Sequence, residues 1–453
     1  MPPKTPQLSD HDLFRMRLEA MIDGRHELVR LARLIDWTRF DEAFGALYDE
    51  NRGRPALPTR LMAGLHLLKH IKGLSDEQIC AQWVENPYLQ AFCGEEFFRH
   101  ELPLDRSSMT RWRGRIGPEK LEVLLAETVA VATKAGAVSP REMERVTVDT
   151  TVATKAVAHP TDSHLLLRAI EWMNRAAKKA GIVLRQSFLR LAQRARREVG
   201  RLLHTGGHAQ GLRHLRRMRT FAGRLWRDIT RKAGAEAEGD PRLALVLERV
   251  GRLLAQKPQD RDKLYALHAP EVECIGKGKA RVRYEFGVKC SLAVTNARAA
   301  GGQFVLGART VPGNPYDGHT LAGQIDQVEA LTGHRVRRAY VDRGYRGHKL
   351  ERDGLTVVVS HTRGIVSPTV RREMRRRNAI EPVIGHLKSD GLLERNHLRG
   401  ASGDAINVVL AAAGHNLRLL LAWLRCLCVL IVAAISAALG SPHANRELAY
   451  DVV

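Results

Sequence analysis

The chain has 453 residues, which is long enough for two or three domains with a sizeable core. Its formal net charge of +23 indicates a polyanionic partner, most simply nucleic acid, and a solvated basic surface is the alternative. Aromatic residues make up only 5% of the chain, which argues against a protein that binds single strands by base stacking.

The cysteine and hydropathy patterns predict a reduced, cytoplasmic protein. None of the six cysteines lies in a CxxC pair, so a zinc framework is not expected. The first residues contain no apolar segment typical of a secretory signal. Residues 426–439 are apolar but shorter than the ~20 residues that span a bilayer. We therefore expect a buried helix there and no membrane partner.

Residues 1–130 have the patterns of helices. Apolar side chains recur at helical spacing over residues 57–72, and Gly73 ends that helix. Ser75, with Gln78 three residues on, is a capping-box signature for the next helix. The pair is compatible with a helix-turn-helix motif and equally with ordinary helix packing.

Residues 105–117 predict a short basic helix capped by Ser107 or Ser108. Guanidinium groups gathered on one helix suit contacts with a nucleic-acid backbone, and a helix N-terminus suits a phosphate. The alternative is a solvated basic helix that Trp112 anchors in the core. The candidate backbone-binding residues here are Arg106, Arg111, Arg113 and Arg115.

The first convincing strand covers residues 146–152, where β-branched residues alternate, and Asp149 lies in its middle. Aspartate is disfavoured in strands, so a metal or a charged partner would explain it. A long basic helical segment follows. Residues 168–232 carry 18 Lys and Arg against three acids, and Gly206-Gly207 predicts a break. This segment is interpreted as a DNA-gripping arm, with a solvated helical hairpin as the alternative.

The remaining elements predict a mixed α/β sheet flanked by helices. Strand patterns cover residues 280–295 and 304–311, which we expect to pair, and then 339–342 and 355–360. Helical patterns cover residues 320–332, 369–388 and 405 onwards.

Three acids form the candidate metal site: Asp149, Asp342 at the end of the 339–342 strand, and Glu381 beyond the last strand. If the two strands are neighbours, their acids converge near one edge of the sheet. Carboxylates are the hard ligands that Mg²⁺ prefers, and two such ions could drive an in-line displacement at phosphorus. Lys388 shares a helix face with Glu381, where we expect it to meet a phosphate. Pro382 is expected to interrupt the helix, so Arg377 is not expected on that face.

The chain resembles bacterial insertion-sequence transposases of the DDE type, in the family numbered five. The motifs that carry the resemblance are, in chain order, residues 74–77 (LSDE), 92–94 (FCG), 105–117 (DRSSMTRWRGRIG), 148–152 (VDTTV), 159–163 (HPTDS), 342–345 (DRGY) and 381–388 (EPVIGHLK). They span most of the chain. Each motif is weak by itself, and it is their order that makes the resemblance specific.

The resemblance implies a ribonuclease-H-like mixed-sheet catalytic core with Asp149, Asp342 and Glu381 as catalytic and metal-binding residues. It implies two Mg²⁺ ions, which Mn²⁺ could replace. Related transposases carry a Tyr, Arg, Glu, Lys signature around the glutamate. Arg377, Glu381 and Lys388 match it and are candidate DNA-binding or catalytic residues, but Met374 stands at the tyrosine position.

The implied domain layout is an N-terminal helical DNA-binding domain over residues 1–140, a catalytic core over 141–163 and 261–453, and a basic helical insertion over 164–260. The implied function is binding of terminal inverted repeats, cleavage of the ends and strand transfer to target DNA, by a homodimer associated with the nucleoid. A host structure-selective nuclease of similar fold and a catalytically inactive nucleic-acid-binding protein are the alternatives.

Overall fold

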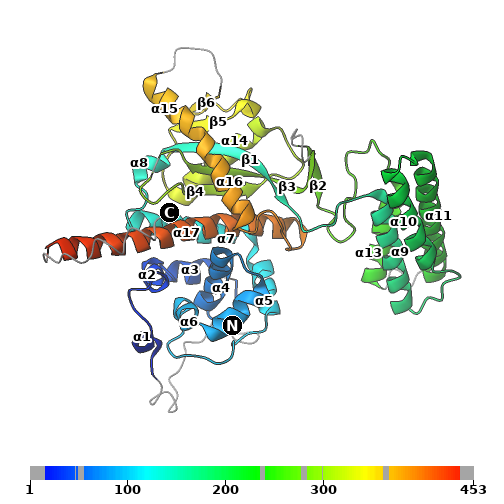
Figure 1. Cartoon of the computed structure of the whole chain (residues 1–453), viewed down its shortest axis with the longest axis horizontal. Helices are drawn as coiled ribbons and strands as arrows, with labels where there is room; N and C mark the ends of the chain where they lie inside the picture. Colours follow the sequence, from blue (N-terminus) through cyan, green and yellow to red (C-terminus); the bar gives the residue numbers. More distant parts are fainter. Residues whose placement is uncertain are drawn as a thin grey trace. The chain divides into compact units, whose positions relative to one another are not determined.

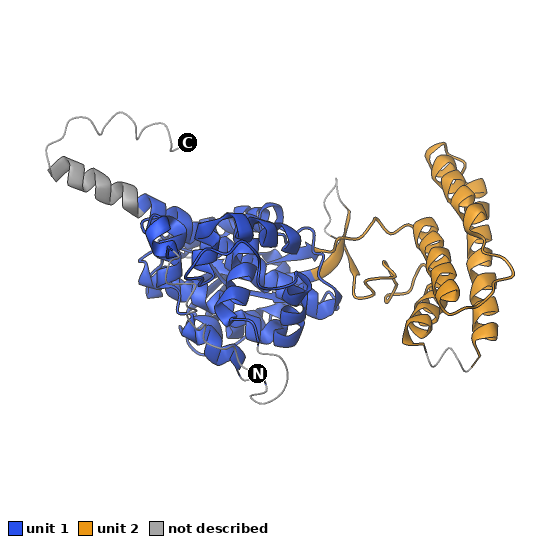
Figure 2. Cartoon of the chain, turned by 90° about the horizontal axis from the view of Figure 1, so that it is seen from below, with its two compact units in different colours: residues 1–153, 289–453 blue, residues 154–288 orange. Residues whose placement is uncertain are grey.

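The computed structural model describes residues 16–45, 47–48, 56–234, 240–276, 283–297, 299–360 and 367–438, with side chains described up to residue 426. The chain divides into two compact units (Figures 1 and 2). Unit 1 contains residues 1–153 and 289–453, and unit 2 contains residues 154–288. The domain boundaries predicted above, at residues 140, 163 and 260, stay predictions.

A mixed β-sheet is the centre of unit 1. Its strands are β1 (Arg145–Thr154), the later part of β3 (Tyr284–Thr295), β4 (Val305–Thr310), β5 (Arg338–Val341) and β6 (Thr356–Val359). The predicted pair of strands is confirmed, because β3 and β4 are antiparallel neighbours. β1 is central and separates β3 from β5, and β6 follows β5.

Strand direction changes at β1. The hydrogen bond from the Asn296 amide to the Arg145 carbonyl, together with that from Lys155 to Phe286, makes β1 and β3 antiparallel. β5 and β6 instead run parallel to β1. Parallel strands end at the same edge of a sheet, so residues that follow β1 and β5 emerge together.

The helices that precede β1 in the chain lie within the first 144 residues, and they pack around one another. Their bounds are α1 (Leu18–Met21), α2 (Glu27–Leu34), α3 (Thr38–Gly45), α4 (Thr59–Lys72), α5 (Asp76–Glu85), α6 (Pro87–Phe92), α7 (Ser107–Lys134) and α8 (Pro140–Met143). Gly73 ends α4 in the left-handed region with φ of 65°, which glycine adopts without steric cost. The capping box of Ser75 and Gln78 is confirmed at the start of α5.

The helices after β4 cover the sheet and carry the candidate third acid. They are α14 (Asp317–Thr332), the 3₁₀ helix η2 (Arg343–Tyr345), α15 (Pro368–Arg376), the 3₁₀ helix η3 (Arg377–Ala379), α16 (Ile380–Ser389) and α17 (Gly400–Ala438). Figure 1 shows α15 and α16 following one another across the sheet.

Helix α17 lies between the sheet and the N-terminal helices, in contact with β4, α7, α4 and α2. Its buried Asn416 exchanges two 2.8 Å hydrogen bonds with the Val305 backbone and donates to Thr128 of α7. Residues 400–426 are long and apolar enough to cross a membrane, but most of this stretch is buried inside the protein. The interior of unit 1 accounts for that hydrophobicity, and residues 439–453 lie outside the described part of the chain.

Unit 2 is a bundle of α9 (Asp162–Lys179), α10 (Leu189–His204), α11 (His208–Ala233) and α13 (Pro241–Ala255), followed by β2 (Glu273–Gly276), which pairs with the start of β3. The bundle has its own core, in which Ile170, Met218 and Val250 are fully buried. The predicted break at Gly206-Gly207 is confirmed, because α10 ends at His204 and α11 begins at His208. The whole chain is therefore mixed α/β.

Candidate active site

Asp149 and Asp342 lie on neighbouring parallel strands at the same level. Thr147 of β1 pairs with Tyr340 of β5, and each aspartate comes two residues later. Residues two apart point to the same face of a strand, and adjacent strands are about 4.8 Å apart. The expectation that these two acids converge is therefore confirmed by the sheet.

The turn after β5 fixes the carboxylate of Asp342. Its Oδ1 accepts a 2.8 Å hydrogen bond from the Gly344 amide. A Cβ atom placed on Gly344 would lie 2.9 Å from Asp342 Oδ1 and 3.1 Å from Asp317 Oδ2. Only glycine leaves room between these two carboxylates. The short distance from Gly344 to Asp317 shows that this third acid faces the same turn.

The electrostatics of the site are those of carboxylates held close together, with Arg377 beside Asp149 and Lys289 paired with Asp317. Burial and the negative charge of Asp342 raise the pKa of Asp149 to about 6. Asp317 adds to this increase, while the Thr150 amide and the Arg377 guanidinium oppose it. The three aspartates thus interact electrostatically at one place.

Asp317 is the residue that the sequence patterns missed. It is the first residue of α14, where an acid suits the helix dipole, and the predicted helix began only at residue 320. Its Oδ1 accepts 3.0 Å hydrogen bonds from Lys289 of β3 and Thr150 of β1. The sequence signal that could have identified Asp317 is an acid at the start of a helix, followed by Gly318. The two hydrogen bonds of Asp317 connect the start of α14 to β1, the strand of Asp149, and to β3.

We expect Asp317→Asn to lower DNA cleavage by about ten- to a hundredfold, the range typical of residues that orient metal ligands. The substitution removes the charge that pairs with Lys289, whose side chain is only 13% exposed. Single-turnover cleavage measures the effect. Asp326→Asn is the matched control on the same helix, because Asp326 is 59% exposed and pairs with Arg352 at the surface. Equal cleavage rates for the two variants would show that Asp317 does not belong to the site.

The structure corrects the expectation for Arg377. Its Nη1 lies 3.7 Å from Asp149 Oδ2, and its side chain is only 14% exposed. Pro382 does not rotate Arg377 away, because the proline occupies the first turn of α16, where its missing N–H does little harm. The chain stays right-handed helical from Arg376 through the 3₁₀ turn to Ile380.

Glu381 lies in the first turn of α16, one turn after Arg377, and its side chain is exposed. Within the described residues, no three His, Cys, Asp or Glu side chains form a group that could hold a metal ion. The structure thus brings together Asp149 and Asp342 of the predicted triad and leaves Glu381 outside their group. Lys388 is half-buried in the last turn of the same helix.

A buried carboxylate attaches α15 to the sheet. Glu373 is 1% exposed, and it accepts 2.8 Å bonds from Arg145 at the start of β1 and from Arg338 of β5. The Tyr340 hydroxyl also donates to it. Burial raises the pKa of Glu373, but these hydrogen bonds outweigh burial and hold it below the ordinary value. Glu373 precedes Arg377 by one helical turn, so this network holds Arg377 near Asp149.

The basic helix at residues 105–117 begins α7, and its arginines have different environments. Arg106, Arg111 and Arg115 are exposed, as backbone contacts would require. Arg113 is 4% exposed; its Nη2 lies 2.6 Å from Asp76 Oδ2, and its Nη1 lies 3.1 Å from His66. A buried, paired guanidinium of this kind holds helices together, and the contact of Arg113 with DNA stays a prediction.

Comparison with known proteins gives two matches. A family model described as "Transposase domain (DUF772)" matches residues 16–115, which include α2 to α6 and the start of α7. The protein named "Uncharacterized protein ORF8 in nfe locus" from Rhizobium meliloti is 56% identical over 204 residues, covering 45% of this chain and 98% of the relative. No solved structure matches the chain.

Proposed function

Because the chain belongs to the same family as the Rhizobium meliloti ORF8 protein and carries a transposase domain, we propose that it is a DDE transposase of insertion-sequence family five. It binds the terminal inverted repeats of its element, cleaves the ends and joins them to target DNA. The mixed sheet of unit 1 is its ribonuclease-H-like core, and the helices before β1 form its DNA-binding domain. It acts in the cytoplasm, on the nucleoid.

The observation that carries the proposal is the placement of Asp149 and Asp342 at one level of two adjacent parallel strands. Two carboxylates that share a site repel each other, and a divalent cation removes that repulsion. The raised pKa of Asp149 is the electrostatic signature of such a pair. The oxygen-only donor set fits Mg²⁺ in its chemistry.

Asp149 and Asp342 would hold Mg²⁺ or Mn²⁺ in a two-ion site, with Glu381 as the proposed third acid. Bound there, the ions supply an activated nucleophile and stabilise the leaving oxygen of an in-line displacement. The Gly344 amide orients Asp342, and Asp317 accepts a hydrogen bond from Thr150, the residue after Asp149. Arg377 faces Asp149 with a fixed positive charge, suited to a DNA phosphate at the same place. Lys388 provides a second phosphate contact.

Unit 2 is the main source of positive charge for a DNA backbone. Residues 154–288 contain 29 Lys and Arg against 13 Asp and Glu, so the unit carries +16 of the net +23. Salt bridges within unit 2, among them those of Asp228 and Glu198, leave most of its arginines exposed. Phosphate contacts of this kind release counterions, which makes affinity steeply dependent on salt.

We expect neutralisation of four exposed arginines on α11 to flatten the salt dependence of DNA binding. Each lost phosphate contact lowers the slope of log affinity against log salt by about 0.9, so the slope falls by up to about 3.6. Titrations of a duplex at several salt concentrations measure it. As the control, changing the same four arginines to lysine keeps the positive charge, so the slope of log affinity against log salt is expected to stay unchanged. An unchanged slope after neutralisation would show that the charge is only a solvated surface. The positions are Arg213, Arg216, Arg224 and Arg227.

The test of the proposed function is cleavage of DNA that carries the repeats flanking the gene. Sequencing that DNA is expected to reveal matched terminal inverted repeats with short target duplications. Purified protein with Mg²⁺ then cuts at the repeat ends and joins them to a target plasmid. Preference for branched DNA without joining would instead indicate a nuclease. Pairing of two ends implies a homodimer on DNA, which mass measurement of the complex checks.

A further inference from the structure

Unit 2 contains a pocket along α9 that the proposed catalysis does not use. Its volume is about 350 Å³, near the lower end of the ~300–1,000 Å³ range of small-ligand sites, so it has room for little more than one ring system. One wall is helix α9 and the other is the segment before β2. The lining includes His164, Leu165, Arg168 and Trp172 of α9, with Leu267 and His268 on the other wall.

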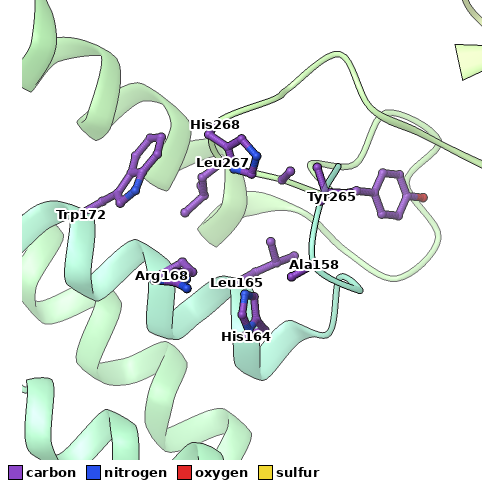
Figure 3. A pocket seen from close by; sticks show the side chains of 10 residues that line it. Ala158, His164, Leu165, Arg168, Trp172, Tyr265, Leu267 and His268 are labelled. Carbon is purple, nitrogen blue, oxygen red and sulfur yellow. The ribbon is translucent and has the colours of Figure 1, made fainter. Parts of the chain in front are cut away.

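Helix α9 presents two planar rings and a guanidinium to this pocket. His164, Arg168 and Trp172 are spaced four residues apart and therefore share one face of the helix. Figure 3 shows them in succession along α9, with His268 and Leu267 across the space and the Tyr265 ring turned away. The opposite face of α9 buries Ile170 and Met173 in the bundle core.

The base of the pocket is formed by buried apolar side chains, and polar side chains surround it. Leu165 and Leu267 are 6% and 3% exposed. Trp172 is half-buried and packs against the bundle core, which holds its ring in place. The other tryptophan of unit 2, Trp226, is a core residue that donates to the Leu247 carbonyl. Trp172 is thus the tryptophan of unit 2 that lines a pocket.

The charged groups around the pocket determine which class of ligand it can bind. Arg168 is 54% exposed, and its bond to Glu171 leaves other guanidinium donors free. Burial and the charges of Arg196 and Arg168 lower the pKa of His164, so its ring is neutral at physiological pH. Aromatic rings beside cations, in a unit of net charge +16, combine stacking with phosphate attraction.

We propose that this pocket binds one unpaired nucleobase of the DNA, stacked against Trp172 with Arg168 on the adjoining phosphate. The proposal rests on the proposed function only for DNA as the partner. A paired base cannot enter, because both of its faces are already stacked in the duplex. The pocket therefore favours strand ends and unpaired positions over continuous duplex, without reading sequence.

The experiment compares a single-stranded oligonucleotide carrying one 2-aminopurine with the fully paired duplex of the same sequence, using the full-length protein. Trp172→Ala is expected to weaken single-strand binding about tenfold, and to abolish the quenching of 2-aminopurine fluorescence, because one base stack is lost. Duplex affinity stays within about twofold. His268→Ala, at an exposed position, gives a smaller loss in the same direction and serves if Trp172→Ala does not fold.

Arg213→Gln is the matched control, since it removes an exposed charge of unit 2 away from the pocket and lowers single-strand and duplex affinity alike. Unchanged single-strand affinity and quenching in a folded pocket variant would overturn the proposal, as would equal losses for both DNA forms. Duplex binding and end cleavage that persist in that case leave the proposed function intact. Failure to bind any DNA overturns both.

Discussion

Asp149→Asn is expected to abolish DNA cleavage and at the same time to stabilise the metal-free protein above pH 6. Activity is lost because the amide cannot serve as the carboxylate ligand of a divalent cation. Stability is gained because burial and the negative charge of Asp342 make a charged carboxylate unfavourable at this position, and Arg377 offsets this effect only in part. Loss of cleavage with a gain in stability distinguishes a functional carboxylate from a structural one.

The direction of the pH effect follows from the pKa of Asp149. The native carboxyl titrates at about 6, against 3.8 for an ordinary aspartate. The native state therefore binds a proton that the unfolded chain has already released, and its stability falls as the pH rises from about 4 to about 6. The whole shift corresponds to roughly 3 kcal/mol, which Asp149→Asn recovers at neutral pH.

Urea unfolding in EDTA at several pH values measures this difference, and cleavage of a repeat-bearing DNA measures the activity. Added Mg²⁺ is expected to stabilise the unsubstituted protein and not the variant, because binding to the native state adds stability by mass action. Wild-type cleavage by Asp149→Asn would refute the assignment of the site. Identical stability–pH curves would refute the electrostatic account alone.

Glu373→Ala is expected to destabilise unit 1 by about 3–5 kcal/mol, the usual result of removing one partner of a buried ion pair. The substitution leaves Arg145, Arg338 and the Tyr340 hydroxyl without their shared acceptor. It also removes the bonds that attach α15 to β1 and β5. Cleavage is expected to fall even where the variant remains folded, because Arg377 is no longer held near Asp149.

The control for Glu373 is Glu144→Ala at the neighbouring surface. Glu144 pairs with Arg337 at 3.4 Å, but their side chains are 33% and 71% exposed, so the loss is expected to be below about 1 kcal/mol. Since the pKa of Glu373 is lowered on folding, its contribution is present above the unfolded value and disappears as the pH falls through the lowered one. Equal unfolding midpoints for the two variants would contradict the role of the network.

Local patterns were sufficient to predict most elements of the fold. Alternating β-branched residues predicted β1, and glycine pairs predicted the break between α10 and α11, because these signals act within a few residues. Asp149 and Asp342 could be chosen as candidate site residues for the same reason, since each is an acid in or directly after a strand. Local patterns did not reveal the burial of Arg113, because its partner Asp76 is 37 residues away in the chain.

The sequence by itself determined the mixed α/β composition, and its charge, periodicity and strand positions indicated a nucleic-acid partner and two acids of the candidate site. Only the tertiary structure decided which residues meet. The parallel pairing of β1 with β5 placed the two acids together. Folding also placed Asp317 against Lys289 of β3, and Glu373 against Arg145 at the start of β1. An aromatic content of 5% argued against base stacking, yet the fold gathers Trp172 and two histidines around one pocket. Contacts between residues that are far apart in the chain depend on long-range packing, which no local sequence pattern encodes.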